Sequence, residues 1–173
     1  MKCLGSPAAL FAGLFLLVGC ATPPSSTAPD LAGRLVLRVE ANDGTEPHSF
    51  GTGFELRGDG RAGELRLTTP IGSTTAQARW RPGAAELITA EAQRGFADLD
   101  ALAQELLGEA LPLAALIEWL RGRPWPGAPS LASPGGFEQL GWHVDLSRFA
   151  EGWVLAARER TPAISVRVRL ELP

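Results

Sequence analysis

The sequence predicts an α+β protein that is mainly β: a curved antiparallel sheet or open barrel with a helical hairpin against its concave side. Hydrophobic residues alternate with polar residues before residue 82 and after residue 136, with the period of two that marks strands with one dry face. Between residues 98 and 122 the hydrophobic period becomes 3.6, which indicates helices. Strands on both sides of a helical pair favour one mixed domain.

Four alternating runs form the first group of predicted strands, at residues 33–40, 50–56, 64–69 and 73–81. Turn-forming sequences separate them, namely Asn42-Asp43-Gly44, Asp59-Gly60 and Pro82-Gly83. The hydrophobic residues of these runs that we expect on the dry face are Leu35, Leu37, Val39, Phe50, Phe54, Leu56, Leu65, Leu67, Ala76, Ala78 and Trp80.

Two helices follow. Asp98 is a good N-cap for a helix that Gly108 ends, and Pro112 opens a second helix that ends near Gly122. We expect them to form a hairpin. The Pro- and Gly-rich segment 123–136 predicts an irregular excursion. Strands resume at 137–140, 142–149, 153–159 and 165–172.

The N-terminus predicts a secretory signal, because Lys2 precedes an apolar run over residues 8–18 that is too short to cross a bilayer core of about 30 Å. Leu17-Val18-Gly19-Cys20 resembles the bacterial lipobox, which implies cleavage before Cys20 and lipidation of its thiol. The alternative is an ordinary signal peptide with a chance cysteine. Ala21 stands where inner-membrane lipoproteins often carry Asp, so the resemblance implies sorting to the outer membrane.

These observations divide the chain into three expected parts. Residues 1–19 are a lipoprotein signal peptide, residues 20–32 are the lipidated cysteine and a flexible tether, and residues 33–173 are one folded domain. The tether is rich in Pro, Ser and Thr, which cannot bury enough apolar area to fold. With Cys3 removed and Cys20 acylated, no thiol is left for a disulfide.

Composition argues against several functions. The chain has 16 basic and 19 acidic residues, a net charge of −3 spread along its length, whereas nucleic-acid binding needs a basic stripe. Gly58 to Gly63 matches the spacing of a dinucleotide fingerprint, but a predicted strand follows it, so we interpret it as a hairpin turn. His48 and His143 are isolated, and we expect no catalytic residue, cofactor or metal site.

The remaining signals are apolar. Thr69-Pro70-Ile71-Gly72 joins two predicted strands and places a large aliphatic residue at a turn; Ile71 either tucks inward or forms an exposed tip that enters a membrane. For each tryptophan core packing is the plain interpretation, but together they could line a cavity between sheet and helices, which is where apolar ligands are usually held. The tryptophans concerned are Trp80, Trp119, Trp142 and Trp153.

Several strings resemble the LolB family of outer-membrane lipoproteins: Leu65 to Thr74, Pro82-Gly83, Asp98 to Leu107, Leu111-Pro112-Leu113, and Trp119 to Gly122. Gly33-Arg34 and the stretches Gly136 to Phe149 and Gly152-Trp153 are also similar. The resemblance implies an open barrel of roughly eleven strands around a hydrophobic cavity, related in shape to the carrier LolA. The sequence departs from the family in the short segment between Cys20 and Gly33, where the helix that family members carry is shortened or missing. One side of the cavity is therefore either more open or covered by 123–136.

The resemblance also implies a function. A monomer anchored in the inner leaflet of the outer membrane, facing the periplasm, would accept lipoproteins from a LolA-like carrier and insert them into the outer-membrane lipid, without being an enzyme. Pro70, Ile71 and Gly72 would form the membrane-directed loop. The residues that would line the acyl-chain cavity are Leu37, Phe54, Leu67, Trp80, Leu116, Trp119, Trp142 and Trp153. The alternative is an envelope assembly protein that binds another protein through an apolar face.

Overall fold

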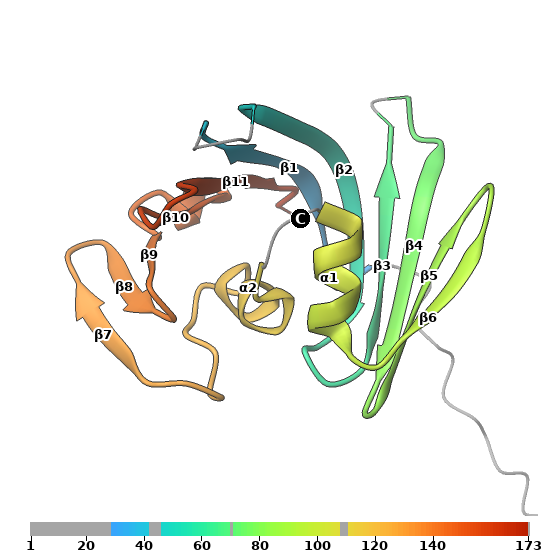
Figure 1. Cartoon of the computed structure of the whole chain (residues 1–173). Coiled ribbons are helices and arrows are strands. Elements are labelled where there is room, and N and C mark those ends of the chain that lie inside the picture. The colour runs from blue at the N-terminus through green and yellow to red at the C-terminus, as the bar shows by residue number, and fades with distance from the viewer. Residues whose placement is uncertain (1–28, 42–45, 70, 108–110, 173) are drawn as a thin grey trace, which may run out of the picture.

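The computed structural model describes residues 29–41, 46–69, 71–107 and 111–172, and within these ranges eleven strands form a single antiparallel sheet (Figure 1). The elements are β1 (Leu31–Val39), β2 (His48–Gly58), β3 (Gly63–Thr68), β4 (Thr74–Arg81), β5 (Ala84–Thr89), β6 (Gln93–Phe96), α1 (Leu99–Leu107), α2 (Leu113–Trp119), β7 (Ser130–Ser133), β8 (Gly136–Gln139), β9 (Trp142–Asp145), the 3-10 turn η1 (Phe149–Glu151), β10 (Trp153–Arg158) and β11 (Ile164–Leu170). None of the helices within these ranges has the length and apolar character that a bilayer-spanning helix requires.

The strand order is β6-β5-β4-β3-β2-β1-β11-β10-β9-β8-β7, so β1 and β11 join the N-terminal and C-terminal halves of the sheet. β6 and β7 stand at its two edges, which leaves the barrel open. The sheet curls around the helices: α2 lies inside the curve of β1, β11 and β10, and α1 stands between α2 and β3 to β5 (Figure 1). The predicted fold class is therefore confirmed.

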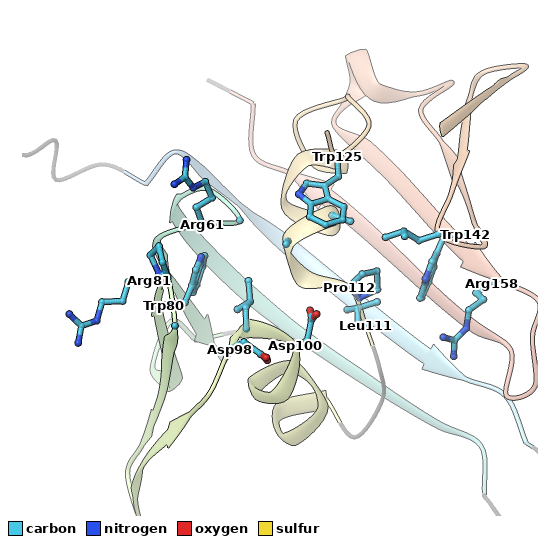
Figure 2. Close-up of a pocket in the computed structure, with 17 residues that line it drawn as sticks. Arg61, Trp80, Arg81, Asp98, Asp100, Leu111, Pro112, Trp125, Trp142 and Arg158 are labelled. Carbon is cyan, nitrogen blue, oxygen red and sulfur yellow. The ribbon is translucent and has the colours of Figure 1, made fainter. Parts of the chain in front are cut away.

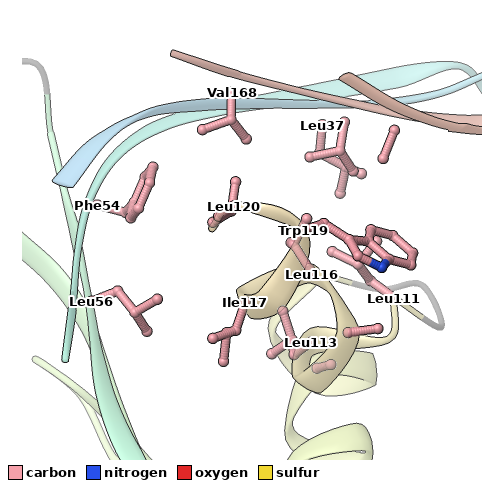
Figure 3. Packing of buried hydrophobic residues seen from close by; sticks show 14 of the residues in the cluster. Leu37, Phe54, Leu56, Leu111, Leu113, Leu116, Ile117, Trp119, Leu120 and Val168 are labelled. Carbon is pink, nitrogen blue, oxygen red and sulfur yellow. The ribbon is translucent and has the colours of Figure 1, made fainter. Parts of the chain in front are cut away.

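The concave face of the sheet is apolar, and α2 covers it. Alternation along β1 and β11 turns Leu37, Val39, Val166 and Val168 inward, where all four are buried. Figure 3 shows α2 between two walls, with Ile117 facing Leu56 and Leu120 below Val168. The buried apolar residues of α2 and its flanks are Leu111, Leu113, Ala115, Leu116, Ile117, Trp119 and Leu120. Each large one contributes about 1.5–3 kcal/mol.

The predicted helix starts are confirmed. The Asp98 carboxylate accepts a hydrogen bond from the backbone N–H of Ala101 at 2.8 Å, which satisfies one free donor of the first turn of α1. Pro112 immediately precedes α2, whose C-terminal turn closes at Gly122, a residue with φ of 75°. Gly108, predicted to end the first helix, lies outside the described residues.

The sequence prediction was wrong at three strands. It missed β5, although Ala85 and Leu87 of this strand are buried, it missed β6, and it treated 123–136 as irregular although β7 lies within it. β6 and β7 are edge strands with mostly exposed residues, so their sequences carry no hydrophobic alternation. The predicted strand 142–149 ends at Asp145, and η1 follows.

The ordered domain also begins before residue 33. β1 starts at Leu31, two residues inside the segment expected to be a tether. Asp30 is held as well, since its carboxylate accepts the N–H of Gly58 at 2.7 Å and its own N–H donates to the carbonyl of Leu56 at 2.8 Å. The main-chain pairing of β1 with β2 thus reaches further toward the N-terminus than the hydrophobic pattern does.

A buried amide ties three parts of the fold together. Gln139 at the end of β8 accepts hydrogen bonds at its Oε1 from the indole N–H of Trp119, at 2.8 Å, and from the backbone N–H of Trp125, at 2.9 Å. Its Nε2 donates to the carbonyls of Trp125 and Ala128, both at 2.8 Å. One side chain therefore joins α2, the Pro-rich segment and the C-terminal half of the sheet.

We predict that Gln139→Leu lowers the free energy of unfolding by about 3 kcal/mol, because it leaves several buried donors and acceptors without partners at about 1–3 kcal/mol each. Urea unfolding followed by tryptophan fluorescence measures the change. Glu138→Leu, on the exposed face of the same strand, is the control and should change stability by less than about 0.5 kcal/mol. Equal stability of the two variants would contradict the role of the amide.

Candidate functional site

A cleft of about 740 Å³ opens between the two halves of the sheet, beside the N-terminal ends of both helices (Figure 2). This volume lies within the range of about 300–1,000 Å³ typical of ligand sites. Its wall is mostly apolar and contains three tryptophans, Trp80 from β4, Trp125 from the Pro-rich segment and Trp142 from β9. The other apolar lining residues are Leu99, Leu111, Pro112, Ala114, Ala115 and Leu140.

Each tryptophan of the cleft is held in place by a different contact. The indole N–H of Trp80 donates to the carbonyl of Asp59 at 2.7 Å. The guanidinium of Arg158 lies over the ring of Trp142, 5.4 Å from its centre. Trp125 is fixed through its backbone by Gln139, and its ring lies so close to Gly127 that a Cβ there would approach it to 2.2 Å. The aromatic wall is therefore built before any ligand arrives.

Charged side chains also belong to the lining of the cleft. Arg61, Arg81, Asp98, Asp100 and Arg158 belong to its lining, and Figure 2 shows them around the tryptophans. Asp98 already serves as the cap of α1. Within the described part of the chain no three His, Cys, Asp or Glu side chains gather in a way that could hold a metal ion.

The hairpin turn between β2 and β3 supports one side of the cleft. The pKa of Asp59 lies below its ordinary value because its Oδ1 accepts hydrogen bonds from the backbone N–H groups of Arg61, at 2.7 Å, and Ala62, at 3.1 Å. The ionised carboxylate thus stabilises the turn at neutral pH. Gly58 to Gly63 is a strand-to-strand turn, as the sequence predicted.

A second cavity lies deeper, between α2 and the inner face of β1 to β3. It measures only about 50 Å³, room for about four water molecules, because the side chains of α2 fill the interior. Thr52 is the only polar residue in its described lining, and the Thr52 hydroxyl already donates to the carbonyl of Thr68 at 3.0 Å. We call this cavity the slot; it follows β2 from Phe50 to Leu56. An acyl chain fits in it only if the helices shift.

The slot and the cleft together contain most of the residues that the sequence predicted around a cavity. Phe54, Leu67 and Leu116 line the slot, Trp142 lines the cleft, and Trp80 lines both. Leu37 and Trp119 line neither, since both are packed in the core. The ring of Trp119 lies against Phe137 and Trp142, with ring centres 6.4 and 6.0 Å apart.

Trp153, which we expected to face the cavity, lies on the outer face of the sheet. It alternates with Val154 and Ala156, which are both buried, so its side chain points the other way. The guanidinium groups of Arg148 and Arg169 lie over its ring, 5.7 and 5.2 Å from the centre. Successive side chains of a strand point to opposite faces, so the burial of Val154 places Trp153 on the outer face. The sequence pattern around residue 153 did not show which face of the strand was exposed to water.

The turn between β3 and β4 projects Ile71 into solvent, with 89% of the residue exposed. Thr69 closes the turn: its N–H donates to the carbonyl of Ser73 at 2.9 Å, and its carbonyl accepts the N–H of Gly72 at 2.9 Å. Gly72 has φ of 87°, a conformation that favours glycine. Of the two alternatives for Ile71, the structure shows the exposed tip; Pro70 and Cys20 lie outside the described residues.

Sequence reasoning missed Trp125, Leu99 and Leu111 as lining residues. Trp125 lies in a segment without regular periodicity, so nothing in the pattern assigned it a face, although a tryptophan between two prolines was a visible signal. Leu99 stands at the first position of α1 and Leu111 just before α2, so both appeared only as helix residues or their flanks.

The C-terminal end of α2 is fastened to the sheet through Arg121. Glu118, which is buried, pairs with Arg121 at 2.9 Å and with Arg123 at 2.6 Å. Arg121 also donates to the carbonyl of Gly58 at the end of β2. Because Trp119 is bonded to Gln139 as well, α2 is connected by hydrogen bonds to both halves of the sheet.

Known proteins are similar to this sequence over nearly its whole length. The family described as outer membrane lipoprotein LolB matches residues 30–172. A protein of Bordetella petrii named outer-membrane lipoprotein LolB is 40% identical, with 93% of this chain and 89% of that protein covered. Its namesake from Bordetella pertussis is 37% identical over 93% of this chain and 88% of its own length.

A more distant relative with the same name, from Chromobacterium violaceum, is 32% identical over 79% of each chain. The family match spans every described strand and both helices, so it includes the cleft, the slot and the Ile71 turn. From its open eleven-stranded barrel and from these matches, the chain belongs to the LolB family of outer-membrane lipoproteins.

Proposed function

We propose that this protein is a lipid-anchored receptor of the outer membrane that accepts lipoproteins from a LolA-like periplasmic carrier and inserts them into the bilayer. Membership of the LolB family and the name of its relatives support the location and the pathway. The observation that carries the proposal is the combination of an open, tryptophan-lined cleft, an apolar slot and an exposed isoleucine on a fixed turn.

The acyl chains of a lipoprotein need such a path. Each buried methylene contributes about 0.8 kcal/mol, so a chain of roughly 15 carbons loses about 12 kcal/mol when it is exposed to water. A wall of tryptophan, leucine and alanine shields the chain from water and makes few hydrogen-bond demands, so the chain can slide along it. Transfer then follows a gradient of affinity from carrier to receptor to membrane, without a nucleotide.

The narrowness of the slot fits this gradient. Chains that enter must displace contacts between α2 and the sheet, because the slot holds only about 50 Å³. The protein therefore holds a chain less favourably than a bilayer does, where no packed side chain has to move. A receptor that must release its cargo benefits from such a limited affinity.

Two apolar groups would bind the protein to the membrane, namely the lipid on Cys20 and the side chain of Ile71. The lipid on Cys20 anchors the chain to the inner leaflet of the outer membrane, and a second membrane contact is what stable anchoring generally requires. Ile71 supplies it, since burying one isoleucine contributes about 1.5–3 kcal/mol. The protein acts as a monomer that touches carrier, client lipoproteins and lipid in turn.

We expect Ile71→Glu to slow insertion of lipoproteins into liposomes about ten- to a hundredfold, because it removes an apolar contact and adds a charge that membranes disfavour. Acceptance from the loaded carrier should be unchanged. The measurement is a reconstituted handover assay that separates the two steps. Leu131→Glu, at another exposed position on β7, is the matched control and should insert normally. If both variants insert at the wild-type rate, the turn has no role in membrane contact.

A second prediction concerns the cleft. Trp125→Glu should weaken binding of a fluorescent fatty acid about tenfold and impair acceptance from the carrier, since it places a charge in the apolar wall. The backbone bonds of Trp125 to Gln139 remain, so the fold should persist. Trp153→Glu makes the same change on the outer face and should bind the probe normally. No probe binding by the wild-type protein would instead favour a protein-binding assembly module.

A further inference from the structure

We infer that acyl chains pass through this protein in one direction: they enter at the tryptophan cleft, cross a gate made by Leu99 and Leu111 into the slot, and leave beside Ile71. This inference rests on the proposed function and adds a route and two positioning residues to it. On this route, acceptance from the carrier takes place at the cleft, and release into the membrane takes place beside Ile71.

The first observation is a shared wall. Trp80, Leu99 and Leu111 line both the cleft and the slot, so these three side chains form a wall between the wide cavity and the narrow one. All three are buried. A chain that lies along the tryptophans of the cleft therefore needs only a small displacement at this wall to continue under α2.

The second observation is the far end of the slot. Phe50 lines the slot and is nevertheless 39% exposed, so the slot reaches the surface there. β2 pairs with β3 as far as Gly53 and Thr68, and Phe50 and Ile71 each stand three residues beyond this last pair. The open end of the slot and the turn that is proposed to meet the membrane therefore lie at the same end of these two strands.

The two mouths lie at opposite ends of the strands. The cleft includes Trp80 to Gly83, at the C-terminal end of β4, whereas Ile71 stands before its N-terminal end. β4 has eight residues, so about 25 Å separates these ends at about 3.3 Å per residue. A chain of roughly 15 carbons spans most of this distance, so a chain whose head lies at the inner end of the cleft extends along most of the way to the exit.

The hydrogen bonds around the wall indicate which side chains move. Trp80 is bonded to the carbonyl of Asp59, and α2 is bonded to both halves of the sheet through Trp119 and Arg121. α1 carries an ion pair to the sheet between Glu105 and Arg94, which are both exposed. An exposed pair contributes little to stability. The side chains of Leu99 and Leu111 are apolar and are held by packing alone, so these two residues are the movable part of the wall.

A photo-cross-linking experiment tests the route with the full lipidated protein and a fatty acid that carries a diazirine at its terminal carbon. Cleavage after arginine yields a peptide of residues 39–57, which contains the slot side of β2, and a peptide of residues 122–148, which contains Trp125 and Trp142 of the cleft. Mass spectrometry then reports how much label each peptide carries. We expect label in both peptides of the wild-type protein.

The decisive variant is Leu111→Trp, which enlarges the gate residue. It should lower the label in peptide 39–57 about tenfold and leave the label in peptide 122–148 unchanged, because the chain still reaches the cleft but no longer passes the wall. Leu111→Ala, which cannot overpack the core, should raise the label in peptide 39–57 relative to the wild type. Unfolding in urea shows that both variants are folded.

The possible failures are distinguishable. If Leu111→Trp and Leu111→Ala both label peptide 39–57 at the wild-type level, the gate is excluded while acyl binding stands. If Leu111→Trp reduces the label of both peptides equally in a folded protein, the cleft and slot are not sequential, and the route is overturned. If the wild-type protein labels neither peptide, the proposed function itself fails and the route fails with it.

Discussion

The packing of α2 against the concave face of the sheet is the contact on which the rest of the structure depends. Because β6 and β7 stand at separate edges, the strands cannot close over their own inner face. The face is nevertheless apolar along β1, β2 and β11 and must be covered. α2 and its flanks cover it with leucine, isoleucine and tryptophan side chains (Figure 3). The same surface that stabilises the fold is thus the surface that a lipid would occupy.

The packing of α2 on the inner face of the sheet explains why the slot is small. A protein with a preformed channel would lose the packing of its core and bind acyl chains tightly. Here the inner face is satisfied by the helix, and a chain has to compete with it. The wide part of the site lies outside this competition, in the cleft, where tryptophan rings present an apolar wall without closing the space.

Buried hydrogen bonds fix some parts of the molecule more firmly than others. Gln139 fastens α2 and the Pro-rich segment to the C-terminal half of the sheet, and Arg121 fastens the end of α2 to β2. Buried bonds of this kind are costly to break, since each leaves a group without its partner. The described part of α1 has its capping bond at Asp98, an exposed ion pair to β6, and buried apolar contacts at Leu99 and Leu102. The proposed gate at Leu99 and Leu111 stands on the side where the cleft and the slot meet.

Local patterns determined much of the fold. Alternation in β1 to β4 and in β11 gave strands with the correct inner face, the cap at Asp98 placed α1, and the proline before Leu113 placed α2. The order of motifs was enough to indicate the family. These features are local because a strand period, a cap or a turn depends on neighbouring residues only.

The site depended on contacts between distant residues. The presence of a tryptophan in a strand does not show which face it lies on, and Trp153 was expected inside but lies outside. Trp125 lies in a segment without periodicity and nevertheless belongs to the wall of the cleft. Edge strands β6 and β7 bury too little to show a pattern. Likewise, the hydrogen bonds of Gln139 and the wall shared by Leu99 and Leu111 exist only once the helices lie in the barrel. The sequence by itself determined which residues are apolar and, outside β5 to β7, in which elements they lie. The tertiary structure decided which of them enclose empty space, because a cavity forms only where packing from several elements stops short.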